Sequence, residues 1–74
     1  MWKSGTETIN GKKIKWEIKV FNEGSQFGIN NGKISKLSIE QDGYQVCNYD
    51  RGWDKKPSTP EAKQVYNMLI AKFN

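Results

Sequence analysis

The sequence predicts an α+β fold, in which a four-stranded antiparallel sheet is followed by one C-terminal helix packed on one face. Polar and apolar residues alternate strictly along residues 13–21, which is typical of a half-buried antiparallel strand. An Asn-Gly dipeptide at 10–11 and an Asp-Gly dipeptide at 42–43 both favour tight hairpin turns. Apolar residues recur at intervals of three and four over residues 62–73, as expected for an amphipathic helix.

A chain of 74 residues has room for one domain, which we expect to span 1–74. A single core of this size rarely supplies more than ~3–5 kcal/mol of stability. Large side chains must therefore provide most of the burial, and three Trp, three Tyr and three Phe meet that need. We expect the core to be formed by these residues: Trp2, Trp16, Ile18, Val20, Leu37, Ile39, Val46, Val65, Leu69 and Phe73.

The first predicted hairpin joins residues 2–9 to residues 13–21. A two-residue loop would place Trp16 opposite Gly5, whereas a three-residue loop places it opposite Thr6. A shift of one residue turns every side chain of a strand to the other face, so burial should select one register. The three-residue loop is favoured because it gathers the apolar residues on one face: Trp2, Ile14, Trp16, Ile18 and Val20.

The second predicted hairpin follows a glycine-rich connection over 22–32. The glycine spacing matches no phosphate-binding motif, so a structural loop is expected there. Pairing across the turn at 42–43 would place Ile39 opposite Val46 and Lys36 opposite Tyr49. Lys36 and Tyr49 would then lie together on the face away from the core.

The helix is predicted to begin after Thr59, which serves as its N-cap, with Pro60 at the first helical position. Ser58 and Glu61 offer an alternative capping box. One helix covers one face of a sheet, so the other face is left for solvent, a partner or a second copy.

The composition argues against several classes of function. Histidine is absent and Cys47 is the only cysteine, which leaves no intrachain disulfide and no zinc site. Asp50 and Asp54 flank Arg51, an arrangement that more often makes structural ion pairs than acid–base catalysis. We expect a protein that is not an enzyme, without metal or cofactor, and Cys47 as a buried or half-buried thiol. No secretory leader or long apolar run is present, so a cytoplasmic protein without membrane association is expected.

Residues 49–54, Tyr-Asp-Arg-Gly-Trp-Asp, form the corner between the sheet and the helix. Arginine and tryptophan close together suit a protein-binding hot spot. The predicted function is therefore a small interaction module that binds an unidentified protein partner through the uncovered sheet face or the Arg51–Trp53 corner, as a monomer or a homodimer. Its candidate binding residues are Lys36, Tyr49, Arg51 and Trp53, with Trp53 mostly buried under the first turn of the helix and Arg51 the more exposed.

Weak nucleic-acid binding is the alternative, because the net charge is +4. Lysines on an open sheet face can contact phosphates while an aromatic residue stacks on a base. The candidate lysines are Lys3, Lys13, Lys15 and Lys19. The same face would also carry Glu7, Glu17 and Glu40, which weaken its positive potential.

Two segments together resemble a known family. Residues 28–37, Gly-Ile-Asn-Asn-Gly-Lys-Ile-Ser-Lys-Leu, and the corner 49–54 are similar to those of short proteins from phages and their Gram-positive hosts. Lys33 lies where that family more often has arginine, and a forked contact there would be weaker with lysine. The family has no established activity, so the resemblance implies a phage or prophage origin and no catalytic residue.

Overall fold

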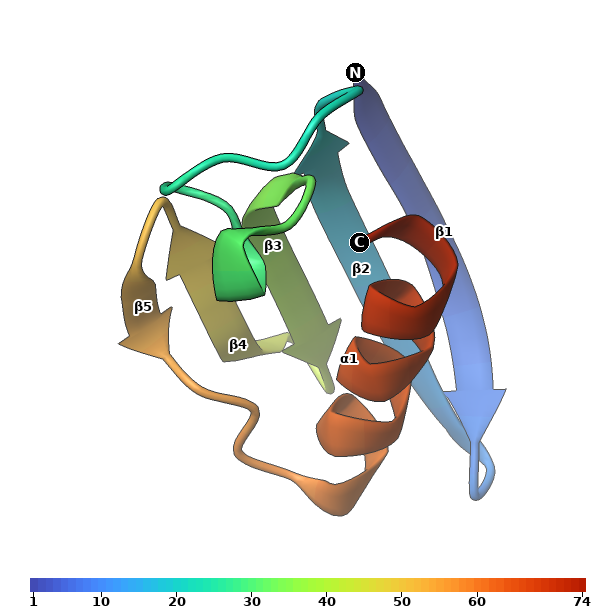
Figure 1. The fold of residues 1–74 in the computed structure, drawn as a ribbon. Coiled ribbons are helices and arrows are strands. Elements are labelled where there is room, and N and C mark those ends of the chain that lie inside the picture. The colour runs from blue at the N-terminus through green and yellow to red at the C-terminus, as the bar shows by residue number, and fades with distance from the viewer.

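The computed structural model describes residues 1–74 and consists of one antiparallel sheet with a single α-helix across one face (Figure 1). The strands are β1 (Trp2–Ile9), β2 (Lys12–Val20), β3 (Ile34–Gln41), β4 (Tyr44–Asp50) and β5 (Trp53–Lys55), and the helix is α1 (Pro60–Phe73). The strands lie side by side in sequence order. The predicted α+β class and the C-terminal helix are confirmed.

The sheet has five strands and not four, because part of the predicted corner forms β5. This strand pairs with β4 through Asn48 and Lys55 and through Tyr49 and Trp53. A strand of three residues is too short to show alternation in the sequence, so the prediction missed it.

The predicted register of the first hairpin is wrong by one residue. Asn10 and Gly11 both adopt positive φ values, 53° and 74°, and form a two-residue turn. Trp16 therefore lies opposite Gly5, and a Cβ atom on Gly5 would be 2.5 Å from the indole ring. The missing side chain of Gly5 provides the space that the large ring needs.

This register turns β1 over relative to the prediction. Trp2 leaves the core and is 54% exposed, which corrects its predicted burial. Lys3 and Glu7 instead lie on the face that α1 covers. The Lys3 Nζ atom is 5.5 Å from the centroid of the Phe73 ring, and Glu7 accepts a hydrogen bond of 3.1 Å from the Trp16 indole nitrogen.

The second hairpin turns at residues 42–43 as predicted, but a β-bulge shifts its register between Ile39 and Glu40. Ile39 therefore pairs with Cys47, and Leu37 pairs with Tyr49. The bulge moves Cys47 and Tyr49 from the predicted outer face into the core, where both are buried.

The core between α1 and the sheet contains twelve buried residues: Ile14, Ile18, Ile29, Ile34, Leu37, Ile39, Val46, Cys47, Tyr49, Ala62, Val65 and Leu69. Six of the ten predicted core residues are among them. Trp16, Val20 and Phe73 are only partly buried and pack against its margin. Trp16 and Phe73 contact each other there, with ring centroids 5.9 Å apart.

The connection between β2 and β3 folds over the end of the core beside α1 (Figure 1). It contains a short 3₁₀ turn, Ile29–Asn31, whose Ile29 side chain is buried. The last residue, Asn74, donates a hydrogen bond to the Ile29 carbonyl and accepts one from the Ile34 backbone amide. The connection is thus packed against the core and tied to the end of the chain.

The helix begins as predicted. The Thr59 hydroxyl oxygen accepts a hydrogen bond from the Ala62 backbone amide, and Pro60 is the first helical residue. Ser58 does not form the alternative capping box, because its hydroxyl donates to the Val46 carbonyl. No helix of the protein is long and apolar enough to cross a lipid bilayer.

Candidate functional site

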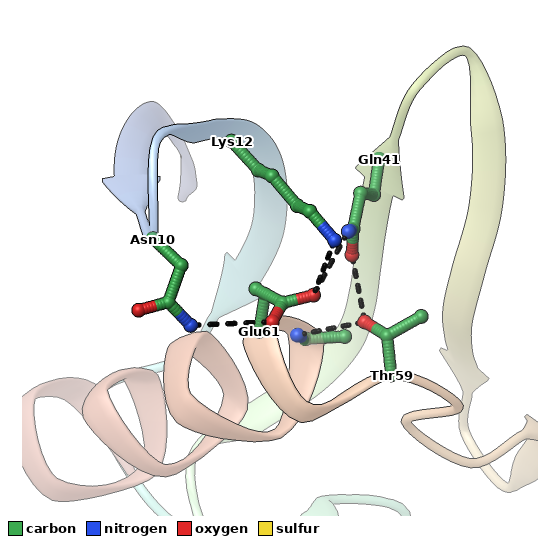
Figure 2. A network of polar contacts seen from close by, with 6 residues as sticks. Asn10, Lys12, Gln41, Thr59 and Glu61 are labelled. Atoms are coloured by element: carbon green, nitrogen blue, oxygen red, sulfur yellow. Dashed lines mark hydrogen bonds and ion pairs between the residues drawn. The ribbon is translucent and has the colours of Figure 1, made fainter.

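The most connected polar cluster surrounds Glu61 in the first turn of α1 (Figure 2). Its carboxylate accepts hydrogen bonds from the side-chain amides of Gln41, at 3.0 Å, and Asn10, at 3.4 Å. The Lys12 ammonium lies 3.6 Å away, and the Thr59 hydroxyl donates to the Gln41 amide oxygen at 2.7 Å. Every member of the cluster has a partner within it. The cluster therefore fastens α1 to β3 and to the β1–β2 turn, and we assign it a structural role.

Acidification should weaken this attachment. The pKa of Glu61 lies below its ordinary value of 4.5, mainly because its carboxylate accepts the hydrogen bond from Gln41. Burial alone would raise this pKa, whereas Asn10 and Lys12 lower it further. A carboxyl with a lowered folded-state pKa stabilises the fold above its unfolded-state pKa, and this contribution is lost as pH falls through the folded-state value.

We therefore expect Glu61→Gln to lower the thermal unfolding midpoint at neutral pH, and to lower it less and less as pH falls below about 4. The measurement is the unfolding midpoint of both proteins between about pH 3 and pH 7. A difference between the two proteins that stays constant over this range would contradict the assigned role of the ionised Glu61.

Cys47 lies fully inside the core, and burial raises the pKa of its thiol to about 12. The thiolate needed for nucleophilic attack is therefore almost absent at neutral pH. The expected buried thiol is confirmed.

A second cluster lies on the opposite side of the molecule, at the end of the sheet where β2 ends, β3 begins and β4 turns into β5. It surrounds a pocket of about 360 Å³ that we call the basic pocket. The lining residues are Lys19, Phe21, Ser25, Phe27, Ser35, Lys36 and Arg51. They comprise three cations, two aromatic rings and two hydroxyls, with no carboxylate among them.

Arg51 occupies an unusual backbone position at the edge of this pocket. Its φ value is 56°, in the left-handed region that glycine, asparagine and aspartate tolerate best. Every other residue of the chain with positive φ is one of these three types. The Arg51 side chain is 68% exposed, and its ion pair with Asp50 is long, at 3.9 Å. Folding thus gains little from an arginine at this position.

Lys19 and Lys36 face each other directly across β2 and β3. Like charges in this position destabilise a sheet. Asp50 offsets one of them, because its carboxylate is 3.7 Å from the Lys36 ammonium. Lys19 has no carboxylate within 4 Å, and its ammonium lies 5.3 Å from the Phe21 ring centroid and 5.9 Å from that of Trp2. Two aromatic rings therefore hold an unpaired cation at the rim of the pocket.

Only two of the four predicted protein-binding residues line the basic pocket. Lys36 and Arg51 line the basic pocket, but Tyr49 is buried and its hydroxyl donates to the Phe27 carbonyl at 2.8 Å. Trp53 packs on the side that α1 covers, with its ring 5.1 Å from Tyr49 and 5.6 Å from Tyr66. Trp53 is 37% exposed, so Arg51 is the more exposed of the two, as predicted.

The four predicted nucleic-acid-binding lysines do not lie together on one surface. Lys3 lies on the covered face, which corrects its predicted position. Lys13 and Lys15 remain on the uncovered face, where Lys15 pairs with Glu40 across β2 and β3. Lys19 alone of the four reaches the basic pocket.

Sequence reasoning missed Phe21 and Phe27, which are about half exposed. Phe27, a large apolar residue in the polar, glycine-rich connection, and Phe21, at the end of the predicted strand just before it, were the available indication. The largest hollow, about 390 Å³, lies elsewhere, in the middle of the uncovered face. Its lining is polar, and the two glutamates in it, Glu17 and Glu40, outnumber its one lysine. We therefore regard the basic pocket as the better candidate site.

Comparison with protein families places the whole chain in one of them. The model of a domain of unknown function, DUF7678, matches residues 1–74. The chain belongs to the DUF7678 family. No curated protein and no solved structure gives a significant match. The family description assigns DUF7678 no activity, so the functional argument rests on the geometry of the basic pocket.

Proposed function

We propose that this DUF7678 protein is a small, non-enzymatic interaction module that binds a protein partner through the basic pocket. The pocket lies at one end of the uncovered sheet face and includes the Arg51 turn, so it joins the two surfaces that the sequence favoured. The proposal includes a cytoplasmic location and a phage or prophage origin, and it applies to a monomer or a homodimer.

The observation that carries the proposal is the placement of Arg51. A left-handed backbone conformation costs a residue with a side chain roughly 1–2 kcal/mol. Glycine or asparagine would avoid most of this cost, and the exposed guanidinium makes only one long ion pair. Local conflicts with folding rules are expected where a residue serves function. The opposed Lys19 and Lys36 are a second such conflict at the same pocket.

Nucleic-acid binding through the whole lysine face has less support. A single-stranded nucleic acid needs a positive groove that follows its backbone. On the uncovered face, Glu17 lies between Lys15 and Lys19 along β2, and Glu40 pairs with Lys15. The positive charge is therefore interrupted outside the basic pocket.

Arg51→Gly tests the proposal. Glycine removes backbone strain and so stabilises the fold by about 1 kcal/mol or more. It also makes the unfolded chain more flexible, which destabilises the fold by ~0.4–1 kcal/mol. The variant should therefore be about as stable as the wild type. We expect immobilised wild-type protein to capture a partner from a lysate of cells that carry its gene. Immobilised Arg51→Gly protein should capture much less of that partner. Quantitative mass spectrometry of the captured proteins measures this.

Lys13→Gln is the matched control, because it removes one positive charge from the same sheet face outside the basic pocket. It should capture the partner as the wild type does. If Arg51→Gly retains every protein that the wild type captures, the proposed function is wrong.

A further inference from the structure

Building on the proposed function, we infer that the basic pocket recognises an acidic peptide segment with one apolar anchor residue. The apolar side chain packs against Phe21 and Phe27, and carboxylates on either side of it pair with the surrounding cations. The partner is thus a protein with an exposed segment in which an aliphatic or aromatic residue lies between aspartates or glutamates.

The charges of the pocket select for an anionic partner. Lys19, Lys36 and Arg51 line it, and Asp50 is the only carboxylate within 4 Å of any of them. Each of its two ion pairs is longer than a good charge-assisted hydrogen bond, which measures about 2.7–2.9 Å. The pocket therefore retains positive charge that an incoming carboxylate can neutralise.

The aromatic residues of the pocket select for an apolar anchor. Phe21 and Phe27 are about half exposed, although large apolar side chains of a small domain are normally needed in its core. Both rings line the same pocket. A volume of about 360 Å³ lies near the lower end of the range for ligand pockets, so it suits one large side chain better than an extended surface.

Two hydroxyl groups of the pocket can bind the peptide backbone. Ser35 is almost completely buried, lines the pocket and makes no side-chain hydrogen bond within the protein. The Ser25 hydroxyl oxygen accepts a hydrogen bond from the Phe27 amide, which leaves its own proton available for donation. Peptide carbonyl groups accept such hydrogen bonds.

The pocket is partly formed before binding. The Ser35 carbonyl accepts a hydrogen bond of 2.9 Å from the Arg51 backbone amide, which attaches the β4–β5 turn to the start of β3. The Tyr49 hydroxyl donates a hydrogen bond to the Phe27 carbonyl, and the Lys19 ammonium lies 5.3 Å from the Phe21 ring centroid and 5.9 Å from that of Trp2. Side chains held in this way lose less entropy when a ligand binds.

Binding of labelled peptides by fluorescence anisotropy tests the inference directly. The probe is the heptapeptide Asp-Glu-Asp-Leu-Asp-Glu-Asp, together with a version that has phenylalanine at the centre. One control peptide has serine at the centre, and another has asparagine and glutamine in place of the acids. We expect the two probes to bind, both controls to bind at least about tenfold more weakly, and probe affinity to fall as salt is added.

Lys19→Glu links the binding to the pocket. The new carboxylate would lie opposite Lys36 and form a favourable cross-strand pair, so folding should not suffer. Because the charge at position 19 is reversed and a second carboxylate comes to lie beside Lys36, we expect probe affinity to fall by at least about tenfold. Lys13→Glu makes the same charge change outside the pocket and should alter affinity by less than about threefold.

The outcomes separate this inference from the proposed function. If no probe binds at concentrations up to about 1 mM, or the serine control binds equally well, the inference is wrong. Capture of a partner that depends on Arg51 would then leave the proposed function in place. If single-stranded oligouridylate binds more tightly than the probes and Lys19→Glu weakens it, the pocket is a nucleic-acid site and both proposals fail.

Discussion

Leu69→Ala is expected to leave a large fraction of the protein molecules unfolded at 25 °C. The Leu69 side chain is completely buried in the middle of α1, within the core shared with the sheet. Replacing a buried leucine by alanine costs about 2–5 kcal/mol, because transfer energy is lost and a cavity remains. A single core of this size supplies roughly 3–5 kcal/mol in all, so the change removes most of the available stability.

Urea unfolding followed by circular dichroism measures this effect. Asn67→Ala is the matched control, because Asn67 is an exposed residue of the same helix. It should change the free energy of unfolding by no more than about 0.5 kcal/mol. Equal stability of the wild type and Leu69→Ala would mean that α1 does not pack on the sheet as described.

Gly28→Ala is expected to disrupt the connection between β2 and β3. A Cβ atom on Gly28 would lie 1.9 Å from the Gly32 carbonyl oxygen and 2.8 Å from its carbonyl carbon. These are backbone atoms within a tight turn, so they cannot move aside as a flexible side chain would. Overpacking of this kind typically costs 1–3 kcal/mol, and we expect a value of about 2–3 kcal/mol here.

The same substitution should also impair the basic pocket, because Phe27 precedes Gly28 and lines it. We expect Gly28→Ala to weaken binding of the acidic probe peptides under conditions where the variant is still folded. Gly52→Ala is the control at another turn beside the pocket. A Cβ atom there meets nothing within 4 Å and φ is not positive, so stability should change by less than about 0.5 kcal/mol. Equal destabilisation by both substitutions would contradict the close approach of Gly28 to Gly32.

The sequence predicted three of the seven residues that line the candidate site, with Lys19 among the nucleic-acid-binding lysines. Lys36 and Arg51 belong to the basic pocket, and they were recognisable as cations beside aromatic residues in the pattern of the second hairpin and the corner. Tyr49 was misplaced because the bulge after Ile39 turned its side chain inward. Phe21 and Phe27 were missed because nothing local to the loop indicates that it folds back beside Arg51.

The core was likewise predicted only in part. Leu37, Ile39, Val65 and Leu69 were correctly placed by periodicity alone, because each lies in a regular element with one buried face. Trp2 was misplaced because its face depends on the register of the first hairpin. The two-residue turn at Asn10 and Gly11 sets that register, and the missing side chain of Gly5 leaves room for Trp16 opposite it.

The sequence by itself determined the features that depend on neighbouring residues. These are the two hairpin turns, the start of α1 at its Thr59 cap, the antiparallel strands and the α+β class. Only the tertiary structure decided the shifted register of the second hairpin, the strand β5 and the basic pocket. Each of these depends on contacts between residues far apart in the chain, such as the hydrogen bonds of Tyr49 to Phe27 and of Arg51 to Ser35. Such contacts leave no periodic pattern in the sequence, because their energies are set by shape and hydrogen bonding in the folded chain.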